Sequence, residues 1–378
     1  MKNVIFVLAF LLGNLCLVFS QLIPASNIST GFDAMSNISQ LPILHPFGTA
    51  TKQFSSFDES GNNNDGITQK AFTKYIDEKA ELVIFDESGP GCLFRQQMNV
   101  WANWDEVTIP KEEWNTARIK YYFDDEAEPK IDMAMSDLFR CKTNPFTAPL
   151  CFIDSTNISG KDVNRFAVMY YPFTFSKRLK VTITPLVVRK DFGHTWYQYT
   201  YLTYPKDKKI DSWKGVGENS DKVRNQWKNM GKDPKDSKNN IRITKTISVP
   251  KGKQKTIVDL KEKGSIASLK FHLTPFTKET FYNTNIKIFW DDNPIPAVDL
   301  PLAYLFGGGG KDFDCSNDVW QKTLTTLLFG FDSKKGDFYT YWPMPYWNAA
   351  KIVIENNSTE NITNFSCELE TKSSKILD

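Results

Sequence analysis

Two pairs of adjacent acidic residues are the first candidates for chemistry in this sequence. Asp124-Asp125 and Asp291-Asp292 each follow a short run rich in Ile, Tyr, Phe or Trp and precede a second such run. Clustered carboxylates can bind calcium, which prefers oxygen ligands. Asp also tolerates the backbone of a tight turn and bonds to nearby main-chain groups. Because both flanks are strand-like, we expect hairpin turns here rather than calcium sites.

The remaining reactive residue types form no recognisable catalytic motif. The three histidines, His45, His194 and His272, do not belong to a serine or cysteine nucleophile motif. His272 lies in an alternating Phe-His-Leu pattern, so we expect it to be structural. The run Gly307 to Gly310 is not followed by the Lys-Ser/Thr of a phosphate loop and is interpreted as a flexible corner. The sequence therefore predicts no cofactor.

The cysteines indicate disulfide chemistry rather than metal binding. Cys16 lies in the N-terminal apolar run, and no Cys-x-x-Cys or His-Cys cluster at zinc spacing occurs in the chain. We therefore predict no metal site. Cys141 and Cys151 enclose a Pro-containing loop and are the best local candidates for a disulfide in an oxidising compartment. The pairing of the other three stays open: Cys92, Cys315 and Cys367.

The N-terminus has the three-part layout of a signal peptide. Lys2 precedes an apolar run from Val4 to Phe19, and Ser20 ends a cleavage pattern that makes Gln21 the expected mature start. The run is short for the roughly 20 residues that a membrane helix needs, so we favour cleavage over an anchor. No later segment is apolar and long enough to span a bilayer. The expected location is extracellular or in the lumen of the secretory pathway, with no membrane attachment after cleavage.

Seven Asn-x-Ser/Thr sequons agree with that compartment. Four of them crowd into residues 356–366, which indicates an exposed segment in a glycosylating compartment. We expect that the adjacent Asn356 and Asn357 do not both carry glycan. The predicted glycosylation sites are Asn27, Asn37, Asn157, Asn356, Asn357, Asn361 and Asn364.

Composition argues against nucleic acid as a partner. The 46 basic and 44 acidic residues are spread through the chain and leave a formal net charge of +2. Nucleic-acid binding requires a clustered basic face instead. The one Lys-rich stretch, Lys206 to Lys238, also contains Asp, Asn and Gly and is interpreted as a solvated linker. Aromatic residues make up 14% of the chain, which favours packed sheets or stacking surfaces over disorder.

An internal repeat organises the chain. Residues 118–139 match residues 285–306 without gaps at an offset of 167, including both Asp-Asp pairs. A second match, at an offset of 171, relates residues 170–183 to 341–354, and a weaker one relates Gly91 to Gly264. Three matches in the same order predict a duplicated domain.

Each copy reads as β structure. Short strands are expected at Arg118 to Phe123 and Asn285 to Trp290, and a long aromatic strand at Trp196 to Tyr204. Short helical turns are expected at Met135–Phe139 and Leu302–Phe306. The predicted fold is all-β, with two tandem jelly-roll or β-sandwich domains. The expected division is a signal peptide at 1–20, an arm at 21–50, a first domain at 51–205, a polar linker at 206–241 and a second domain at 242–378.

Four short motifs occur in a fixed order along the chain: Ser55 to Asp65, Gly89-Pro90-Gly91 with Arg95, Leu305-Phe306-Gly307 and Met344-Pro345-Tyr346. Together they resemble glycoside hydrolase family 172 over roughly residues 53–372. The resemblance begins with a polar loop, continues with a Gly-Pro-Gly and a following Arg, and includes a Phe-Gly corner and a Met-Pro-aromatic segment. Each motif alone is weak, and their order and doubling carry the match.

This resemblance implies jelly rolls assembled as trimers or larger rings, and retaining hydrolysis or transfer on furanosides. That chemistry needs a nucleophile and an acid/base carboxyl about 5 Å apart. The family carries these carboxylates in a segment marked Gly-Thr-Glu-Asp-Tyr, which this sequence lacks up to Asp378. The family loop suggests Asp58, Asn63 and Asp65 as substrate-binding residues. The catalytic residues stay unknown, because the spacing of Glu112-Glu113, Glu355, Asp58 and Asp65 singles out no pair.

Two functions follow as hypotheses. The first is a secreted, noncatalytic member that binds furanose-containing carbohydrate or self-assembles as a homo-oligomer, a trimer by resemblance. Trp101, Trp104 and Trp114 could stack on sugar, although core packing is the more usual role. The second is a furanoside hydrolase or transferase, if the chain is a fragment or a partner chain completes its site.

Overall fold

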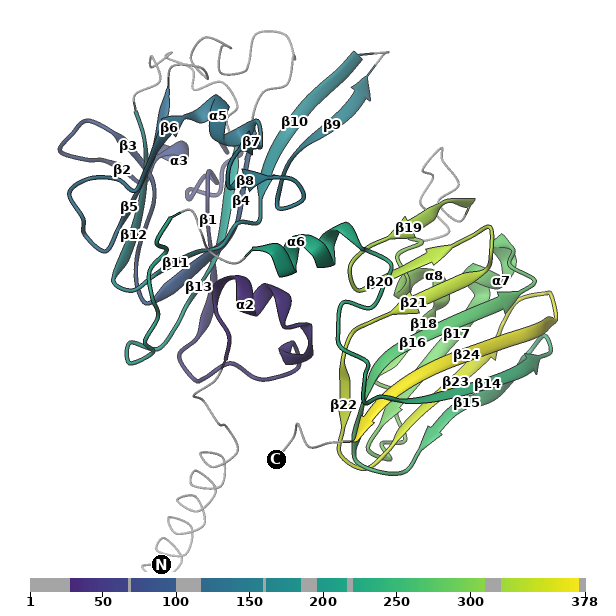
Figure 1. Ribbon diagram of the computed structural model, residues 1–378. Helices are drawn as coiled ribbons and strands as arrows, with labels where there is room; N and C mark the ends of the chain where they lie inside the picture. Colours follow the sequence, from purple (N-terminus) through teal and green to yellow (C-terminus); the bar gives the residue numbers. More distant parts are fainter. Residues whose placement is uncertain are drawn as a thin grey trace, which may run out of the picture. The chain divides into compact units, whose positions relative to one another are not determined.

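The computed structural model describes residues 28–66, 69–99, 117–158, 161–184, 196–215, 220–309 and 321–373. The chain forms two compact units (Figure 1). The first comprises Met1–Met35 and Leu44–Arg224, and the second comprises Ser36–Ile43 and Asn225–Asp378. Each unit is considered by itself. The signal peptide, Asn27, Cys315, His194 and Glu112-Glu113, and the three tryptophans at 101, 104 and 114, lie outside the described residues.

The first unit is a sandwich of two antiparallel sheets. Aromatic side chains from both sheets meet between them, as in the edge-to-face pair of Phe85 and Tyr201, whose ring centroids are 5.0 Å apart. One sheet has the order β1 (Ala50–Ser55), β13 (Tyr197–Thr203), β4 (Gly91–Asn99), β10 (Lys161–Met169) and β9 (Cys151–Ile158), with β11 (Phe173–Phe175) also beside β4. The other has the order β2 (Tyr75–Ile76), β3 (Leu82–Ser88), β12 (Arg178–Ile183), β5 (Arg118–Phe123) and β6 (Ile131–Ala134).

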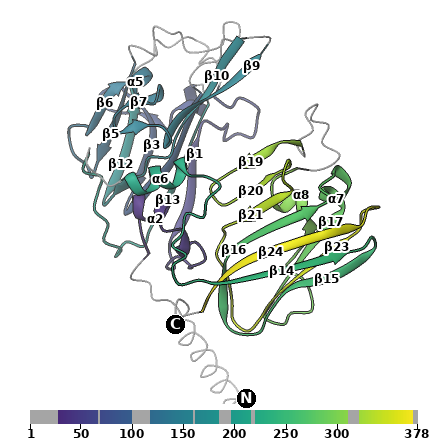
Figure 2. The same ribbon diagram turned by 45° about the vertical axis from the view of Figure 1, so that its right-hand side comes forward.

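The second unit repeats this plan, and Figure 2 shows its two sheets as layers. Phe271, Ile288 and Phe365 belong to the buried core between them. One sheet has the order β14 (Ile241–Val249), β24 (Ile362–Ser373), β16 (Gly264–Thr274), β21 (Asp337–Thr340), β20 (Phe329–Asp332) and β19 (Thr323–Thr325), with β22 (Met344–Tyr346) also beside β16. The other has the order β15 (Lys253–Leu260), β23 (Ala350–Asn356), β17 (Thr284–Trp290) and β18 (Val298–Pro301).

Short elements complete the two units. A small hairpin joins β7 (Lys142–Thr143) to β8 (Phe146–Thr147). The helical turns expected in each repeat are present as α5 (Met135–Phe139) and α8 (Leu302–Leu305). The other helices are α2 (Gly31–Ser36), η1 (Ile38–Gln40), α3 (Gln69–Phe72), α6 (Asp221–Lys228) and α7 (Lys278–Asn283). Among the described residues, the helices lack the length and apolar character needed to cross a bilayer.

Both units have jelly-roll topology, which confirms the predicted fold class. Eight strands of each unit, taken in chain order, pair as first-eighth-third-sixth in one sheet and second-seventh-fourth-fifth in the other. In the first unit these are β1-β13-β4-β10 and β3-β12-β5-β6. In the second they are β14-β24-β16-β21 and β15-β23-β17-β18. The sequence repeat at 118–139 and 285–306 therefore corresponds to equivalent elements, β5-β6-α5 and β17-β18-α8.

The Asp-Asp pairs are turns, as expected. All four aspartates have positive φ, between 53° and 64°, which matches a tight hairpin connection between adjacent strands. The first Asp of each pair also holds the neighbouring loop: Asp124 Oδ1 accepts the amide N–H of Lys177 at 2.7 Å. Asp291 Oδ1 accepts the amide N–H groups of Trp347 at 2.6 Å and Asn348 at 2.8 Å. In each unit, the first Asp of the repeated motif therefore connects the turn to the neighbouring loop, and we call this pair of contacts the Asp clamp.

The weakest sequence match, Gly91 with Gly264, has a clear steric cause. Each glycine begins the third jelly-roll strand and lies opposite an aromatic residue of the short strand beside it. A Cβ at Gly91 would come within 2.7 Å of the Phe175 ring, and one at Gly264 within 2.7 Å of the Tyr346 hydroxyl. Glycine is therefore required at both positions for the same packing reason.

The polar stretch 206–241 is more structured than a solvated linker. Ile210, Trp213 and Val223 are buried, and Trp213 stacks on Phe123 with centroids 5.5 Å apart. Residues 221–228 form α6. Most residues of this stretch are charged, polar or glycine, but the fold buries a few apolar side chains among them. Part of the arm is packed as well, since Phe32 is buried with its ring edge-on to Tyr171 at 4.9 Å between centroids.

The structure joins Cys141 and Cys151 by a disulfide, with Cα atoms 5.2 Å apart. This bond closes the segment that contains the β7-β8 hairpin, between α5 and β9. Cys92 and Cys367 are buried in separate units.

Candidate functional site

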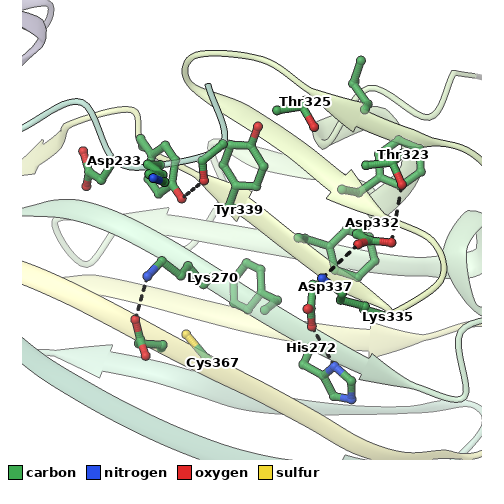
Figure 3. Close-up of a pocket in the computed structure, with 18 of the residues that line it drawn as sticks. Asp233, Lys270, His272, Thr323, Thr325, Asp332, Lys335, Asp337, Tyr339 and Cys367 are labelled. Atoms are coloured by element: carbon green, nitrogen blue, oxygen red, sulfur yellow. Dashed lines mark hydrogen bonds and ion pairs between the residues drawn. The ribbon is translucent and has the colours of Figure 1, made fainter. Parts of the chain in front are cut away.

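A hollow of about 830 Å³ lies in the second unit, on the sheet that contains β16, β21 and β24 (Figure 3). Its volume falls within the roughly 300–1,000 Å³ typical of ligand pockets. Polar side chains dominate the labelled view, and they come from β16, β19, β20, β21 and the segment after α6. The lining includes Asp233, Thr244, Lys270, His272, Thr323, Thr325, Asp332, Asp337, Tyr339, Ser366 and Glu368.

Strand register arranges much of this lining in two parallel rows, because residues opposite each other on antiparallel strands share a face. The first row crosses the sheet through Glu368 of β24, Lys270 of β16 and Tyr339 of β21. The second row lies two residues further along each strand. It runs Ser366, His272, Asp337, Asp332 and Thr323.

The Tyr339 ring forms part of the lining, and a glycine makes room for it. Tyr339 lies opposite Gly330 of β20, and a Cβ there would come within 2.6 Å of the Tyr339 hydroxyl and collide with the carbonyl oxygen of Leu324. The ring therefore lies over β20, and its hydroxyl donates to the carbonyl oxygen of Thr326 at 2.8 Å. Tyr341 stacks beside it at 4.7 Å between centroids. The aromatic surface is thus fixed before any ligand arrives.

Polar groups within each row contact one another. Lys270 Nζ lies 2.9 Å from Glu368 Oε1, and His272 Nδ1 lies 2.8 Å from Asp337 Oδ1. Behind the first row, burial opposes the charged form of Glu370, but hydrogen bonds from Asn240 and Arg242 hold the pKa of its carboxyl below the ordinary value. The sheet therefore presents paired hydrogen-bonding groups in both rows.

Asp332 and Asp337 face each other across the β20-β21 hairpin, but the Asp332 side chain stabilises the turn of that hairpin. Its Oδ1 accepts the amide N–H of Lys334 at 3.0 Å, and its Oδ2 lies 3.5 Å from Lys335 Nζ. Asp337 is engaged by His272. Both carboxylates are therefore engaged by neighbouring groups.

A smaller cavity of about 270 Å³ occurs in the first unit, beside Tyr122, Arg178 and Lys180. The ammonium groups of Lys79 and Lys180 lie over the Tyr122 ring, at 5.2 and 4.7 Å from its centroid. The aromatic face is already occupied by these cations, so this cavity is a weaker candidate for ligand stacking.

The loop residues suggested by sequence lie in the first unit, away from any described cavity. Asp58 Oδ1 accepts the amide and hydroxyl of Ser60 at 3.0 and 2.6 Å, and the Ser60 hydroxyl bond is the main cause of the lowered pKa of Asp58. Asp65 Oδ1 accepts the Asp58 amide at 2.6 Å. Asn63 is exposed. Two of the three thus shape their own loop, and a role in substrate binding stays a prediction.

Other carboxylates weighed from the sequence are also engaged. Glu355 lies 3.0 Å from Lys287 Nζ, and this contact lowers the pKa of its carboxyl. Among the described residues, the His, Cys, Asp and Glu side chains form no group of three that could hold a metal ion.

Sequence reasoning missed the hollow. Tyr339 and Glu368 belong to ordinary alternating strands, and His272 was expected to be structural. The alternation in 264–274 and 362–373 shows which residues share a face, but only the pairing of β16, β21 and β24 brings those faces together.

Comparisons with known families match most of the chain. Residues 47–222 match the GH172 first beta-sandwich domain, and residues 239–369 match a GH172 domain-like model. No curated protein matches the sequence.

Among solved structures, the major capsid protein of STIV, Sulfolobus Turreted Icosahedral Virus, is 8% identical over 86% of this chain and 96% of its own, with a TM-score of 0.23. The major capsid protein P2 of bacteriophage PM2 is 8% identical over 86% of this chain and 99% of its own, with a TM-score of 0.21. Scores this low carry no argument.

Proposed function

Because this chain belongs to the GH172 family, glycoside hydrolase family 172, we propose that it is a secreted protein that binds furanose-containing glycan in the hollow of its second domain. The choice of furanose rests on the family resemblance. The choice of site rests on the hollow itself, whose lining offers an aromatic face and hydrogen-bonding groups, the usual composition of a site for a polar ligand.

The observation that carries the proposal is the fixed ring of Tyr339, which lies in the first row beside the polar side chains of the hollow. An immobilised aromatic face can stack on a sugar ring without losing side-chain entropy at binding. The neighbouring Lys270, Glu368 and His272 supply donors and acceptors for hydroxyl groups. Their mutual pairing means that a neutral sugar can exchange hydrogen bonds with them without leaving a charge unpaired.

Binding is favoured over hydrolysis because the carboxylates of the hollow are committed to other partners. A retaining glycosidase needs one carboxyl as nucleophile and another as acid, about 5 Å apart across the sugar. Four described carboxylates line the hollow, and each has a cationic or imidazole partner. The contacts are Asp233 with Lys235, Asp332 with Lys335, Asp337 with His272 and Glu368 with Lys270.

Calorimetry with arabinofuranose and fructofuranose oligomers tests the proposal, with a glucopyranose oligomer as the comparison ligand. Tyr339→Ala should weaken furanoside binding about tenfold or more, which corresponds to about 1.4 kcal/mol. Tyr304→Ala is the matched control, because Tyr304 is half-exposed on α8 and does not line the hollow. Absence of furanoside binding by the wild-type protein, or equal affinities of wild type and Tyr339→Ala, would refute the assignment.

The same oligomers distinguish the catalytic alternative. A noncatalytic protein leaves them intact after prolonged incubation, whereas a hydrolase or transferase releases monosaccharide or new glycosides. Product formation that survives replacement of all four carboxylates by their amides would place the chemistry outside this hollow; the variants are Asp233→Asn, Asp332→Asn, Asp337→Asn and Glu368→Gln.

A further inference from the structure

We infer that Asn357 and Asn361 are the glycan-bearing residues of the crowded sequon segment, and that Asn356 is a buried structural residue that carries none. The inference rests on the proposed passage of the chain through a glycosylating compartment, but it does not depend on what the hollow binds. It goes beyond the sequence, in which all four sequons of residues 356–366 are equivalent.

N-glycosylation joins the side-chain amide nitrogen to the anomeric carbon of a lipid-diphosphate-linked oligosaccharide. The new N–C bond replaces the C–O bond to the diphosphate, which leaves, and the amide nitrogen loses one proton. In the folded product, this nitrogen must point to solvent and can donate only one hydrogen bond.

Asn356 fails both conditions. Its side chain is fully buried at the end of β23. Its Nδ2 donates two hydrogen bonds of 2.8 Å, to the carbonyl oxygens of Val249 and Glu360. Its Oδ1 accepts the amide and hydroxyl of Ser358 at 3.0 and 2.6 Å. Asn356 therefore connects the end of β14 to the β23-β24 turn by hydrogen bonds. A sugar on Nδ2 would break one of these bonds and would have no path to solvent.

Asn357, one residue later, has the opposite environment. Its side chain is exposed, and its Nδ2 makes a single long contact of 3.3 Å with Glu355 Oε2 at the surface. The second nitrogen proton is sufficient for that contact after glycosylation. Its sequon is completed by Thr359, which is also exposed.

Asn361 is exposed on the same turn and is engaged through its oxygen. Its Oδ1 accepts the amide N–H of Lys251 at 3.0 Å, which leaves the nitrogen side of the amide for the sugar. The geometry of the turn is therefore compatible with a glycan at either exposed residue.

Asn364 lies inside β24, and its sequon is the fourth of the segment. It shares a strand face with Ser366 and Glu368, because alternate residues of a strand point the same way. Its Oδ1 is buried. Asn364 is partly buried and lies opposite Thr274 within a paired strand, unlike the exposed asparagines of the turn. Its amide therefore has less access to solvent than theirs, and it carries no glycan.

The test is secretion of the full chain from a glycosylating cell line, followed by enzymatic glycan release in heavy-oxygen water and peptide mass spectrometry. We expect the isotopic label at Asn357 and Asn361, and none at Asn356 or Asn364. Asn357→Gln leaves the Asn356 sequon intact, so it should remove one glycan without transferring it to Asn356. Asn361→Gln is the matched variant that also removes one glycan.

Glycan on Asn356 in the secreted, folded protein, or secreted protein unmodified at both Asn357 and Asn361, would overturn the inference. The hollow is tested independently, because its sugar affinity is measured on unglycosylated protein. A failure of the glycosylation test therefore does not affect the sugar-binding proposal, and a failure of the sugar-binding test does not affect the glycosylation inference.

Discussion

Replacing Asp124 by alanine should destabilise the first domain far more than the same change at its neighbour Asp125. Both residues have positive φ, 53° and 64°, so alanine carries a similar backbone cost of about 1–2 kcal/mol at either position. Their side chains differ. Asp124 Oδ1 accepts the amides of Ser176 at 3.1 Å and Lys177 at 2.7 Å, whereas Asp125 is exposed and makes one contact of 3.2 Å with Arg178.

The difference can be estimated from these bonds. A hydrogen bond to a charged group contributes about 1.5–3 kcal/mol, so two bonds at the lower end contribute about 3 kcal/mol. Partial exposure of Asp124 reduces this to about 2 kcal/mol, while an exposed ion pair such as that of Asp125 contributes about 0.2–1 kcal/mol. We therefore expect Asp124→Ala to lose about 1–2 kcal/mol more than Asp125→Ala.

Urea unfolding of the full chain, monitored by intrinsic fluorescence, measures the loss of unfolding free energy in both variants. The second domain provides a replicate, because Asp291 makes the equivalent bonds and Asp292 is exposed. Equal losses of unfolding free energy for the two members of each pair, within about 0.5 kcal/mol, would show that the aspartates act only through turn conformation. That result would refute the stabilising role of the Asp clamp.

Three further predictions address the site, the disulfide and the response to acid. Gly330→Ala should displace the Tyr339 ring and weaken furanoside binding in calorimetry while the fold, checked by circular dichroism, is retained; unchanged affinity would contradict the role given to the ring. Replacing both Cys141 and Cys151 by serine removes a disulfide between residues 10 apart and should lower the free energy of unfolding by about 2–3 kcal/mol, measured by thermal unfolding. Adding reductant should not lower the stability of this variant further. The folded-state pKa of Glu370 lies below its ordinary value of 4.5, so its stabilising effect is present above about pH 4.5 and lost as pH falls further. Glu370→Gln should therefore flatten the loss of unfolding free energy between pH 5 and about pH 3, and a variant as acid-sensitive as wild type would show that other groups dominate.

Local patterns in the sequence were sufficient for the fold class and its duplication. Strand alternation, the Asp-Asp turns and the short helical segments each depend on neighbouring residues, because backbone conformation and turn chemistry are local properties. The match of Gly91 with Gly264 was visible as well, although its cause, an aromatic residue on the adjacent strand, was not.

Only the tertiary structure decided which residues line the proposed ligand site and which asparagines of the sequon segment are exposed. The rows through Lys270, Tyr339 and Glu368 join strands about 70 and 100 residues apart in sequence, and no local pattern sets which strands pair. Asn356 and Asn357 are adjacent and chemically identical, yet one is buried against Val249 and the other faces solvent. Burial depends on distant segments meeting, so the sequence alone cannot distinguish the two residues.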